Sequence, residues 1–386
     1  MNNFDYYNPT RVIFGKDSYN RISEQISEVT KDKKILITYG GGSIKKNGVY
    51  DSVIKSLAGY EVFEFSGIKP NPEYNTLMKA VDIVKKENIS FVLAVGGGSV
   101  IDGTKFIVAA SKYDGNPWDV LKQKEGCKFT EAIPLGTVLT LPATGSEMNS
   151  GAVISRSELK EKRTMGGPMT FPKFSFLDPT VVSTLPERQI ANGITDAFMH
   201  TLEQYLTYPS ENLLQERVAE GILSTLIEIA PEVMKDPSNY KAASNLMWCA
   251  TMALNGTLRA GVAYDWSTHM IGHELTALHD IDHARTLAIV APNLFKVKFE
   301  NKKDKLNQYG HRVWGLEGEC AEEAIEKTKS FFESLGIKTK ISDYTSEYAD
   351  SSDIIKERFE ERNWDGIGER GDLTPSEAQK IVELSI

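Results

Sequence analysis

Histidines are concentrated in one stretch of this 386-residue chain, where His269, His273, His279 and His283 make up four of the total of six. On a helix, His269 and His273 would project from one face, because side chains four residues apart lie above one another. This spacing is typical of a pair that chelates one metal ion.

A second pair with the same spacing, Asp196 and His200, lies about seventy residues earlier. Taken alone, such a pair is more often an intrahelical hydrogen bond than a metal site. Its coincidence with His269, His273 and His283 in one predicted helical region favours a shared site. One carboxylate with two or three imidazoles suits Zn²⁺ or Fe²⁺, whereas Mg²⁺ and Ca²⁺ prefer oxygen ligands. The H-E-x-x-H motif of metalloproteases is absent.

Two glycine-rich turns follow predicted strands, because Gly-Gly-Gly-Ser occurs at residues 40–43 and again at 96–99. Backbone amides in such a turn can approach phosphate oxygens without a Cβ in the way, and the next helix N-terminus adds partial positive charge. The pair predicts a dinucleotide site, although each turn could also be a tight connection, and neither matches G-x-G-x-x-G. The predicted contacts are Gly40, Gly41, Gly42, Ser43, Gly97, Gly98 and Ser99.

The first turn also bears on the choice between NAD and NADP. In NAD-specific sheets, an acidic side chain at the end of the second strand of the unit holds the ribose hydroxyls and would repel the 2′-phosphate of NADP. Residues 39–43 include no acid, and Lys45 and Lys46 follow. This favours NADP, unless the two lysines are only a solvated helix face.

Other polar residues of the first half have a structural and a functional interpretation. Ser99 and Asp102 have the spacing of a capping box for a helix over residues 100–110, and we also predict Asp102 as a cofactor contact and a catalytic residue. Asn71, between two prolines, lies in a turn that either closes the sheet edge or faces the cofactor. Hydroxyl groups cluster over residues 140–147 at a strand end, where ligands of open α/β sheets bind. Lys162, in a charged run, would ordinarily be a surface hairpin residue.

The first half alternates apolar β-branched runs with amphipathic helices, which predicts an α/β domain over residues 1–184 with a mostly parallel sheet. The expected strands are 34–39, 61–65, 91–95 and 138–140, after a short strand pair at 6–7 and 11–14, with a helix over 74–87.

From residue 185 to 386 we predict an all-helical domain, because apolar residues recur at spacings of three and four. Ser183 or Thr184 is expected to cap the first helix, which has Pro186 in its first turn and continues to Tyr205. The further expected helices are 211–235, 240–258, 265–278, 283–300, 306–314, 321–335, 352–362 and 375–384.

Composition narrows the class of protein. The net charge is −9 and the pI near 5.4, which argues against nucleic-acid or anionic-membrane partners. The chain has three cysteines that are far apart in the sequence, Cys127, Cys249 and Cys320. This spacing favours reduced thiols over a disulfide framework or a thiolate zinc site. With no signal peptide or long apolar run evident, we expect a cytoplasmic protein.

Together these motifs resemble the iron-containing, or group III, alcohol dehydrogenases from end to end. The resemblance rests on residues 96–102, the run 140–147, Asp196-x3-His200 and His269-x3-His273-x9-His283. Residues 41–50 and 268–277 look like the butanol dehydrogenase and broad aldehyde reductase branch.

The resemblance implies a dinucleotide-binding domain, a helical metal domain, and usually a homodimer or larger assembly. Its implied metal ligands are Asp196, His200, His269 and His283, with His273 near the nicotinamide without being a ligand. The turns at 40–43 and 96–99 would approach the cofactor, commonly NADPH, together with Asn71, Thr140, Thr144 and Lys162. His279 and His311 match no ligand position, so we expect a wall or surface role for the first and a structural role for the second.

The implied reaction is reversible reduction of an aldehyde such as butanal to a primary alcohol, with the metal as a Lewis acid. His273 would either relay a proton or only line the wall of the cleft. One alternative is a metal- and NAD-dependent lyase similar to 3-dehydroquinate synthase, against which the apolar Trp266, Met270 and Met148 argue. Another is a non-catalytic NADP-binding sensor.

Overall fold

The computed structural model describes residues 1–121, 129–364 and 366–386, and its chain divides into two compact units. One unit contains residues 7–185 together with 237–247, and the other contains residues 1–6, 186–236 and 248–386. The fold class predicted from the sequence, a parallel-sheet α/β region followed by a helical region, is confirmed.

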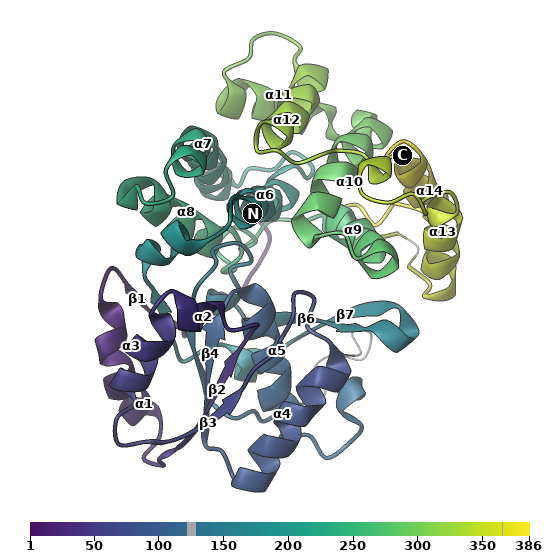
Figure 1. Cartoon of the computed structure of the whole chain (residues 1–386). Helices are drawn as coiled ribbons and strands as arrows, with labels where there is room; N and C mark the ends of the chain where they lie inside the picture. The colour runs from purple at the N-terminus through teal and green to yellow at the C-terminus, as the bar shows by residue number, and fades with distance from the viewer. Residues whose placement is uncertain (122–128, 365) are drawn as a thin grey trace. The chain divides into compact units, whose positions relative to one another are not determined.

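The first unit is built on a six-stranded sheet whose order is β1-β8-β5-β4-β2-β3, with every neighbouring pair parallel. The central strands are buried almost throughout, as strands covered on both faces must be. Figure 1 shows α1 and α3 on one side of the sheet and α4 and α5 on the other. The strands are β1 (Arg11–Phe14), β2 (Lys34–Tyr39), β3 (Glu61–Phe65), β4 (Phe91–Gly96), β5 (Leu135–Leu139) and β8 (Phe174–Leu177). The helices are α1 (Ile22–Val29), α2 (Ser43–Lys46), α3 (Val49–Ser56), α4 (Tyr74–Glu87) and α5 (Gly98–Ala110).

Two strands lie outside this sheet as an antiparallel hairpin of β6 (Gly151–Arg156) and β7 (Glu161–Gly166). Two predicted strands differ from the structure. Residues 6–7 form no strand, so β1 pairs with β8 instead, and the strand expected at 138–140 spans Leu135–Leu139. Cys249 and Cys320 are free and buried thiols, and Cys127 lies outside the described residues.

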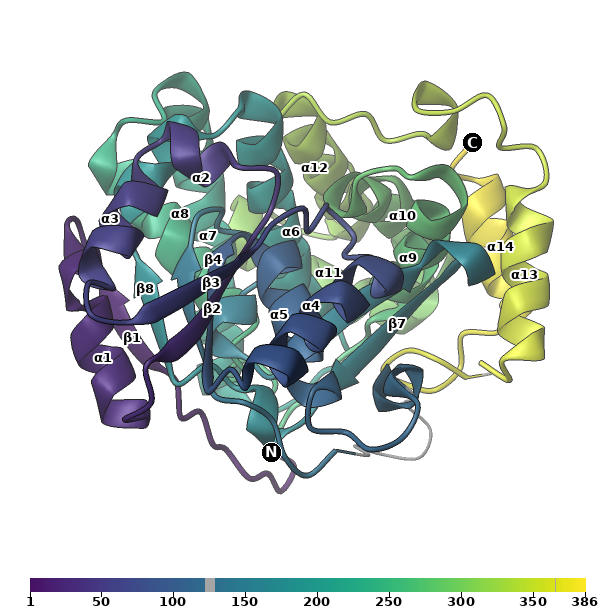
Figure 2. The same ribbon diagram turned by 60° about the horizontal axis from the view of Figure 1, so that its bottom comes forward.

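The second unit consists mainly of helices (Figure 1), with α13 and α14 side by side near the end of the chain in both views (Figure 2). The predicted cap of its first helix is wrong: α6 has Pro186 at the N-cap position, and no side chain caps it. No helix in the described ranges has the length and apolarity that crossing a membrane requires. The helices from residue 187 onward are α6 (Glu187–Tyr205), α7 (Leu213–Lys235), α8 (Tyr240–Ala253), α9 (Ser267–His279), α10 (His283–Val297), α11 (Phe299–Trp314), α12 (Ala321–Ser334), α13 (Ser351–Glu361) and α14 (Pro375–Glu383). Residues 240–247 of α8 belong to the first unit.

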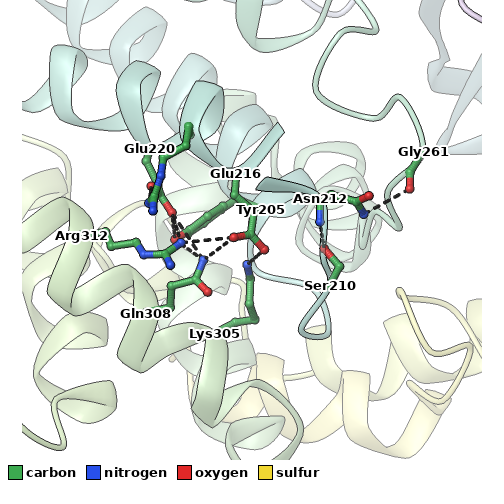
Figure 3. A network of polar contacts seen from close by, with 10 residues as sticks. Tyr205, Ser210, Asn212, Glu216, Glu220, Gly261, Lys305, Gln308 and Arg312 are labelled. Atoms are coloured by element: carbon green, nitrogen blue, oxygen red, sulfur yellow. Dashed lines mark hydrogen bonds and ion pairs between the residues drawn. The ribbon is translucent and has the colours of Figure 1, made fainter. Parts of the chain in front are cut away.

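A polar network joins three of these helices (Figure 3). On α7, Glu216 accepts from Lys305 of α11 at 2.8 Å, and Glu220 accepts from Arg312 of α11 at 2.9 Å. Tyr205, the last residue of α6, donates its hydroxyl proton to Glu220 at 2.9 Å. Because both carboxylates are buried and paired, the network fixes the relative positions of α6, α7 and α11.

Candidate active site

Helix α6 carries the first two candidate ligands on one buried face. Asp196 is 3% exposed and His200 is 5% exposed, so neither side chain is a solvated surface group. The Nε2 atom of His200 lies 3.8 Å from Oδ1 of Asp196. The spacing of four residues therefore brings both side chains to one place, as the sequence predicts.

Helices α9 and α10 bring two more histidines to the same place. Ligand atoms of Asp196, His200 and His269 lie within 4.8 Å of one another, and His269 is the third residue of α9. His283 begins α10, and its Nε2 lies 3.9 Å from Oδ1 of Asp196. The four residues implied by the family resemblance thus converge from three helices.

The chemistry of this group fits a transition metal. Oδ1 of Asp196 is buried and has no hydrogen-bond partner within the described residues, which is costly unless a cation or another donor reaches it. Zinc–ligand bonds of about 2.0–2.2 Å put neighbouring ligand atoms of a tetrahedral site about 3.4 Å apart. The distances of 3.8 and 3.9 Å from Asp196 are slightly wider than that. One carboxylate and three imidazoles therefore suit Fe²⁺ or Zn²⁺.

The three remaining histidines, His273, His279 and His311, are not among the four candidate ligands. The ring centroid of His273 is 4.9 Å from that of His283 and 6.3 Å from that of His269, so His273 is a neighbour of the candidate ligands. His279 is half-buried, with Nε2 at 2.8 Å from the hydroxyl of Ser351, and burial lowers its pKa. His311 donates to the carbonyl of Gly318 at 2.7 Å in an exposed position.

One further carboxylate lies at the site and belongs to no motif in the sequence: Glu203, one turn beyond His200 on α6. Its Oε1 accepts the amide of Thr268 at 2.7 Å, and its Oε2 contacts Nδ1 of His269. Burial raises the pKa of Glu203 well above its usual value, and the Asp265 carboxylate adds to the rise. A histidine that binds metal through Nε2 keeps its proton on Nδ1, where Glu203 can accept it.

The second glycine-rich turn lies at the carboxyl end of β4, beside the threonines predicted with it. The amide of Thr140 donates to the carbonyl of Gly96 at 3.0 Å. A Cβ at Gly98 would lie 2.4 Å from Oγ1 of Thr144, so only glycine allows this close approach. In the first turn, Gly42 has a φ of 92° and precedes α2. Both turns therefore expose strand-end backbone of the kind that can cradle a phosphate.

The capping box predicted for Ser99 and Asp102 is wrong, because α5 has Gly97 at its N-cap and no side-chain cap. Asp102 instead accepts the hydroxyl of Ser146 at 2.6 Å and the amide of Val153 at 2.8 Å. Burial raises the pKa of Asp102 and lowers the pKa of the neighbouring Lys105 to about 8. Asp102 thus ties α5 to the segment that follows β5.

Asn71 and Lys162, which are 91 residues apart, meet in the structure. Nζ of Lys162 donates to Oδ1 of Asn71 at 3.2 Å, and Asn71 has a φ of 55°. Lys162 is only 8% exposed, so the expectation of a surface hairpin residue is wrong. Lys162 lies on β7, and because its neighbours in the sequence are charged, the local sequence predicts an exposed residue at this position.

A second acid that sequence analysis missed, Glu64 on β3, lies beside the first turn. It accepts the hydroxyl of Tyr39 at 2.8 Å and that of Tyr50 at 2.6 Å, and Nζ of Lys45 is 3.5 Å away. Nζ of Lys45 also lies 4.4 Å from the centre of the Tyr50 ring. Burial alone would raise the pKa of Glu64, but the two hydroxyls and Lys45 hold it below its usual value. We call these four residues the Lys45 cluster.

The family is decided by the sequence comparison. Residues 9–179 match the family model described as iron-containing alcohol dehydrogenase, and residues 190–366 match its C-terminal counterpart. The chain belongs to the iron-containing alcohol dehydrogenase family. It is therefore an oxidoreductase of the alcohol dehydrogenase and aldehyde reductase class.

Similar proteins of this family share the fold of this chain, but their names specify different cofactors, NADPH in one and NADH in another. The chain is 50% identical to the NADPH-dependent aldehyde reductase YqhD of Escherichia coli, with all of both chains covered. It is 38% identical to the NADH-dependent butanol dehydrogenase B of Clostridium acetobutylicum, over 100% of this chain and 99% of the relative. The crystal structure of E. coli YqhD superimposes with a TM-score of 0.97 at 49% identity, covering 100% of this chain and 99% of that one.

Proposed function

We propose that this iron-containing alcohol dehydrogenase catalyses reversible reduction of short- to medium-chain aldehydes, such as butanal, with NADPH as the hydride donor. The observation that supports this most directly is the buried group of Asp196, His200 and His269, with His283 at its border. The names of the two relatives support the substrate class, and the E. coli relative supports NADPH.

Each residue of the group has a proposed role. Asp196, His200, His269 and His283 hold a divalent metal, Fe²⁺ or Zn²⁺. When bound, the metal polarises a carbonyl as a Lewis acid and the reduced nicotinamide supplies a hydride. His273 is within reach of the candidate ligands and holds or moves a proton at its imidazole, since imidazole titrates near neutral pH.

We also propose roles for the residues around the glycine-rich turns. The backbone of residues 40–43 and 97–99 binds the phosphates of the cofactor, with Asn71, Thr140, Thr144 and Lys162 as further contacts. Asp102 orients this region through Ser146 and Val153 and is our second candidate catalytic residue. The functional boundary proposed at residue 184 separates these nucleotide contacts from the metal ligands, and a homodimer or larger assembly is proposed from the family resemblance.

The test is oxidation of NADPH with butanal, followed by the loss of NADPH absorbance, using protein loaded with Fe²⁺ or Zn²⁺. The proposal expects turnover that depends on metal and aldehyde together. Absence of turnover with either metal over a panel of aldehydes would contradict it. Elemental analysis of protein purified without added metal would show which ion the group holds, and size-exclusion chromatography would test the assembly.

Preference for NADPH over NADH should depend on the Lys45 cluster. Glu64 is already occupied by two tyrosine hydroxyls and Lys45, so it is poorly placed to accept the ribose hydroxyls of NAD. Lys45 is fixed beside the turn, where its charge favours a 2′-phosphate. Replacement of Lys45 by methionine is expected to raise the KM for NADPH about fivefold, as for an exposed ion pair, and the KM for NADH less than about twofold. Steady-state kinetics with both cofactors measures this.

The matched control is Lys46→Met, because Lys46 is the next residue of α2 and is also exposed. Its KM values are expected to stay near those of the wild type. Equal effects of the two substitutions would indicate general attraction to the basic helix, and the specific role of Lys45 would have to be abandoned.

A further inference from the structure

Trp266, at the N-cap of α9, has a backbone conformation that bulky residues rarely adopt. Its φ is 64° and its ψ is 4°, in the left-handed region that favours glycine. Such strain persists only where surrounding contacts impose it, and it is concentrated at functional sites. The position of the indole ring is thus a constrained feature of the fold.

The residue before Trp266 is fixed by three contacts. The amide of Asp265 donates to the carbonyl of Glu203 at 2.9 Å, and its Oδ1 accepts the amide of Ser267 at 3.0 Å. Its Oδ2 lies 2.9 Å from Nζ of Lys302, whose side chain is 1% exposed. The turn is therefore held on both sides of Trp266.

Lys302 connects this turn to two other parts of the same unit. Its ammonium group donates to Glu369 at 2.8 Å and to the carbonyl of Leu206 at 2.7 Å. Because the lysine and its two carboxylate partners are almost fully buried, none of these contacts is a loose surface pair. They impose the strained conformation.

The imposed conformation places the indole against two of the candidate metal ligands. The ring centroid of Trp266 lies 5.1 Å from that of His269, with the planes at 84°, and 6.1 Å from that of His200, with the planes at 70°. Both arrangements are edge-to-face, and Trp266 is half-buried while both histidines are buried. The indole therefore borders two of the candidate ligands, at a residue that is only partly buried.

We propose that Trp266 is a specificity-determining residue, whose indole forms the apolar wall against which the carbon chain of an unbranched aldehyde packs. This inference rests on the proposed function, because it requires the carbonyl oxygen to be held among the candidate ligands. The second to fourth carbons of the chain then extend over the neighbouring ring. A flat wall in a fixed position accepts a straight chain and excludes one branched next to the carbonyl.

The test compares aldehydes of different shape in three variants, W266F, W266A and W266G. Butanal, ethanal and 2-methylpropanal serve as substrates, and butanamide and ethanamide serve as unreactive carbonyl analogues for calorimetric titration. W266A is expected to raise the KM for butanal about tenfold, as for the loss of one or two methylene contacts, while the KM for ethanal changes less than about threefold. The ratio of kcat/KM for 2-methylpropanal to that for butanal should rise, and butanamide should lose more affinity than ethanamide.

W266G separates the side chain from the backbone, since glycine adopts the left-handed conformation without strain. If the indole is the wall, W266G and W266A shift the specificity in the same way, and W266F retains most of the preference. Metal content per chain, measured by elemental analysis, should stay at the wild-type value in all three. Uniform losses for every aldehyde, or loss of metal in both W266A and W266G, would show that Trp266 only covers the histidines. If the wild type itself reduces no aldehyde, the proposed function fails rather than the role of this residue.

Discussion

Replacement of His269 by alanine is expected to abolish both metal retention and turnover. His269 is one of three residues whose ligand atoms lie within 4.8 Å of one another, and it is the one that α9 contributes. Without its imidazole, only Asp196, His200 and His283 would remain to hold a metal, and the Lewis-acid chemistry that a bound metal would supply would be lost. Metal catalysis of this kind contributes several kcal/mol, so kcat/KM should fall by about a thousandfold or more. Elemental analysis and NADPH oxidation measure the two losses independently.

The control for this variant is His311→Ala, which removes the same side chain from an exposed position on α11. It should retain both metal and activity. If His269→Ala still bound one metal ion per chain and reduced butanal at the wild-type rate, the assignment of Asp196, His200, His269 and His283 as ligands would be wrong. His273→Ala provides a further contrast, because a proton relay should lower kcat while leaving the metal content unchanged.

The regular elements could be predicted from the sequence where their patterns are long or fully apolar. Strands 34–39 and 61–65 and helix 74–87 have the bounds that the sequence predicts. Strand β8 is not among the strands that the sequence predicts. The sequence suggests a hairpin at Lys162 but gives no bounds for β6 and β7, because the charged side chains of β7 obscure its alternation. Lys162 is buried and donates to Asn71, 91 residues away, and a local sequence pattern cannot predict so distant a contact.

In the candidate site, too, the sequence reveals pairs of residues on one helix but not contacts between residues on different elements. Spacing of four residues identifies Asp196 with His200, but it also suggests His269 with His273. The structure groups His269 with Asp196 and His200, and His273 is outside that group of described residues. Glu64 and Glu203 have no motif in the sequence, because each acts through residues on other elements. Only the fold brings those partners together.

Among the acids that the sequence does not reveal, Glu203 is the one whose replacement should change metal binding most. Its carboxylate contacts Nδ1 of His269 and the amide of Thr268, so both oxygens hold the first turn of α9. Partners that orient a metal-binding histidine typically change metal affinity or activity by about 10–100-fold when they are replaced. We therefore expect Glu203 to act as a positioning residue, whose loss should show first in the binding of the metal.

Replacement of Glu203 by glutamine is expected to weaken metal binding by about 10–100-fold, measured by competition with a chelator of known affinity. The amide keeps the shape of the side chain, but it cannot accept from both Thr268 and His269, since one of its two polar atoms is a donor. Glu220→Gln is the matched control, because Glu220 is also buried and hydrogen-bonded but pairs with Arg312 in the network of Figure 3. That control should lower the melting temperature and leave the metal affinity of the folded chain unchanged. Equal affinities in the two variants would show that Glu203 contributes to stability alone, whereas a selective loss in Glu203→Gln would establish that it orients His269.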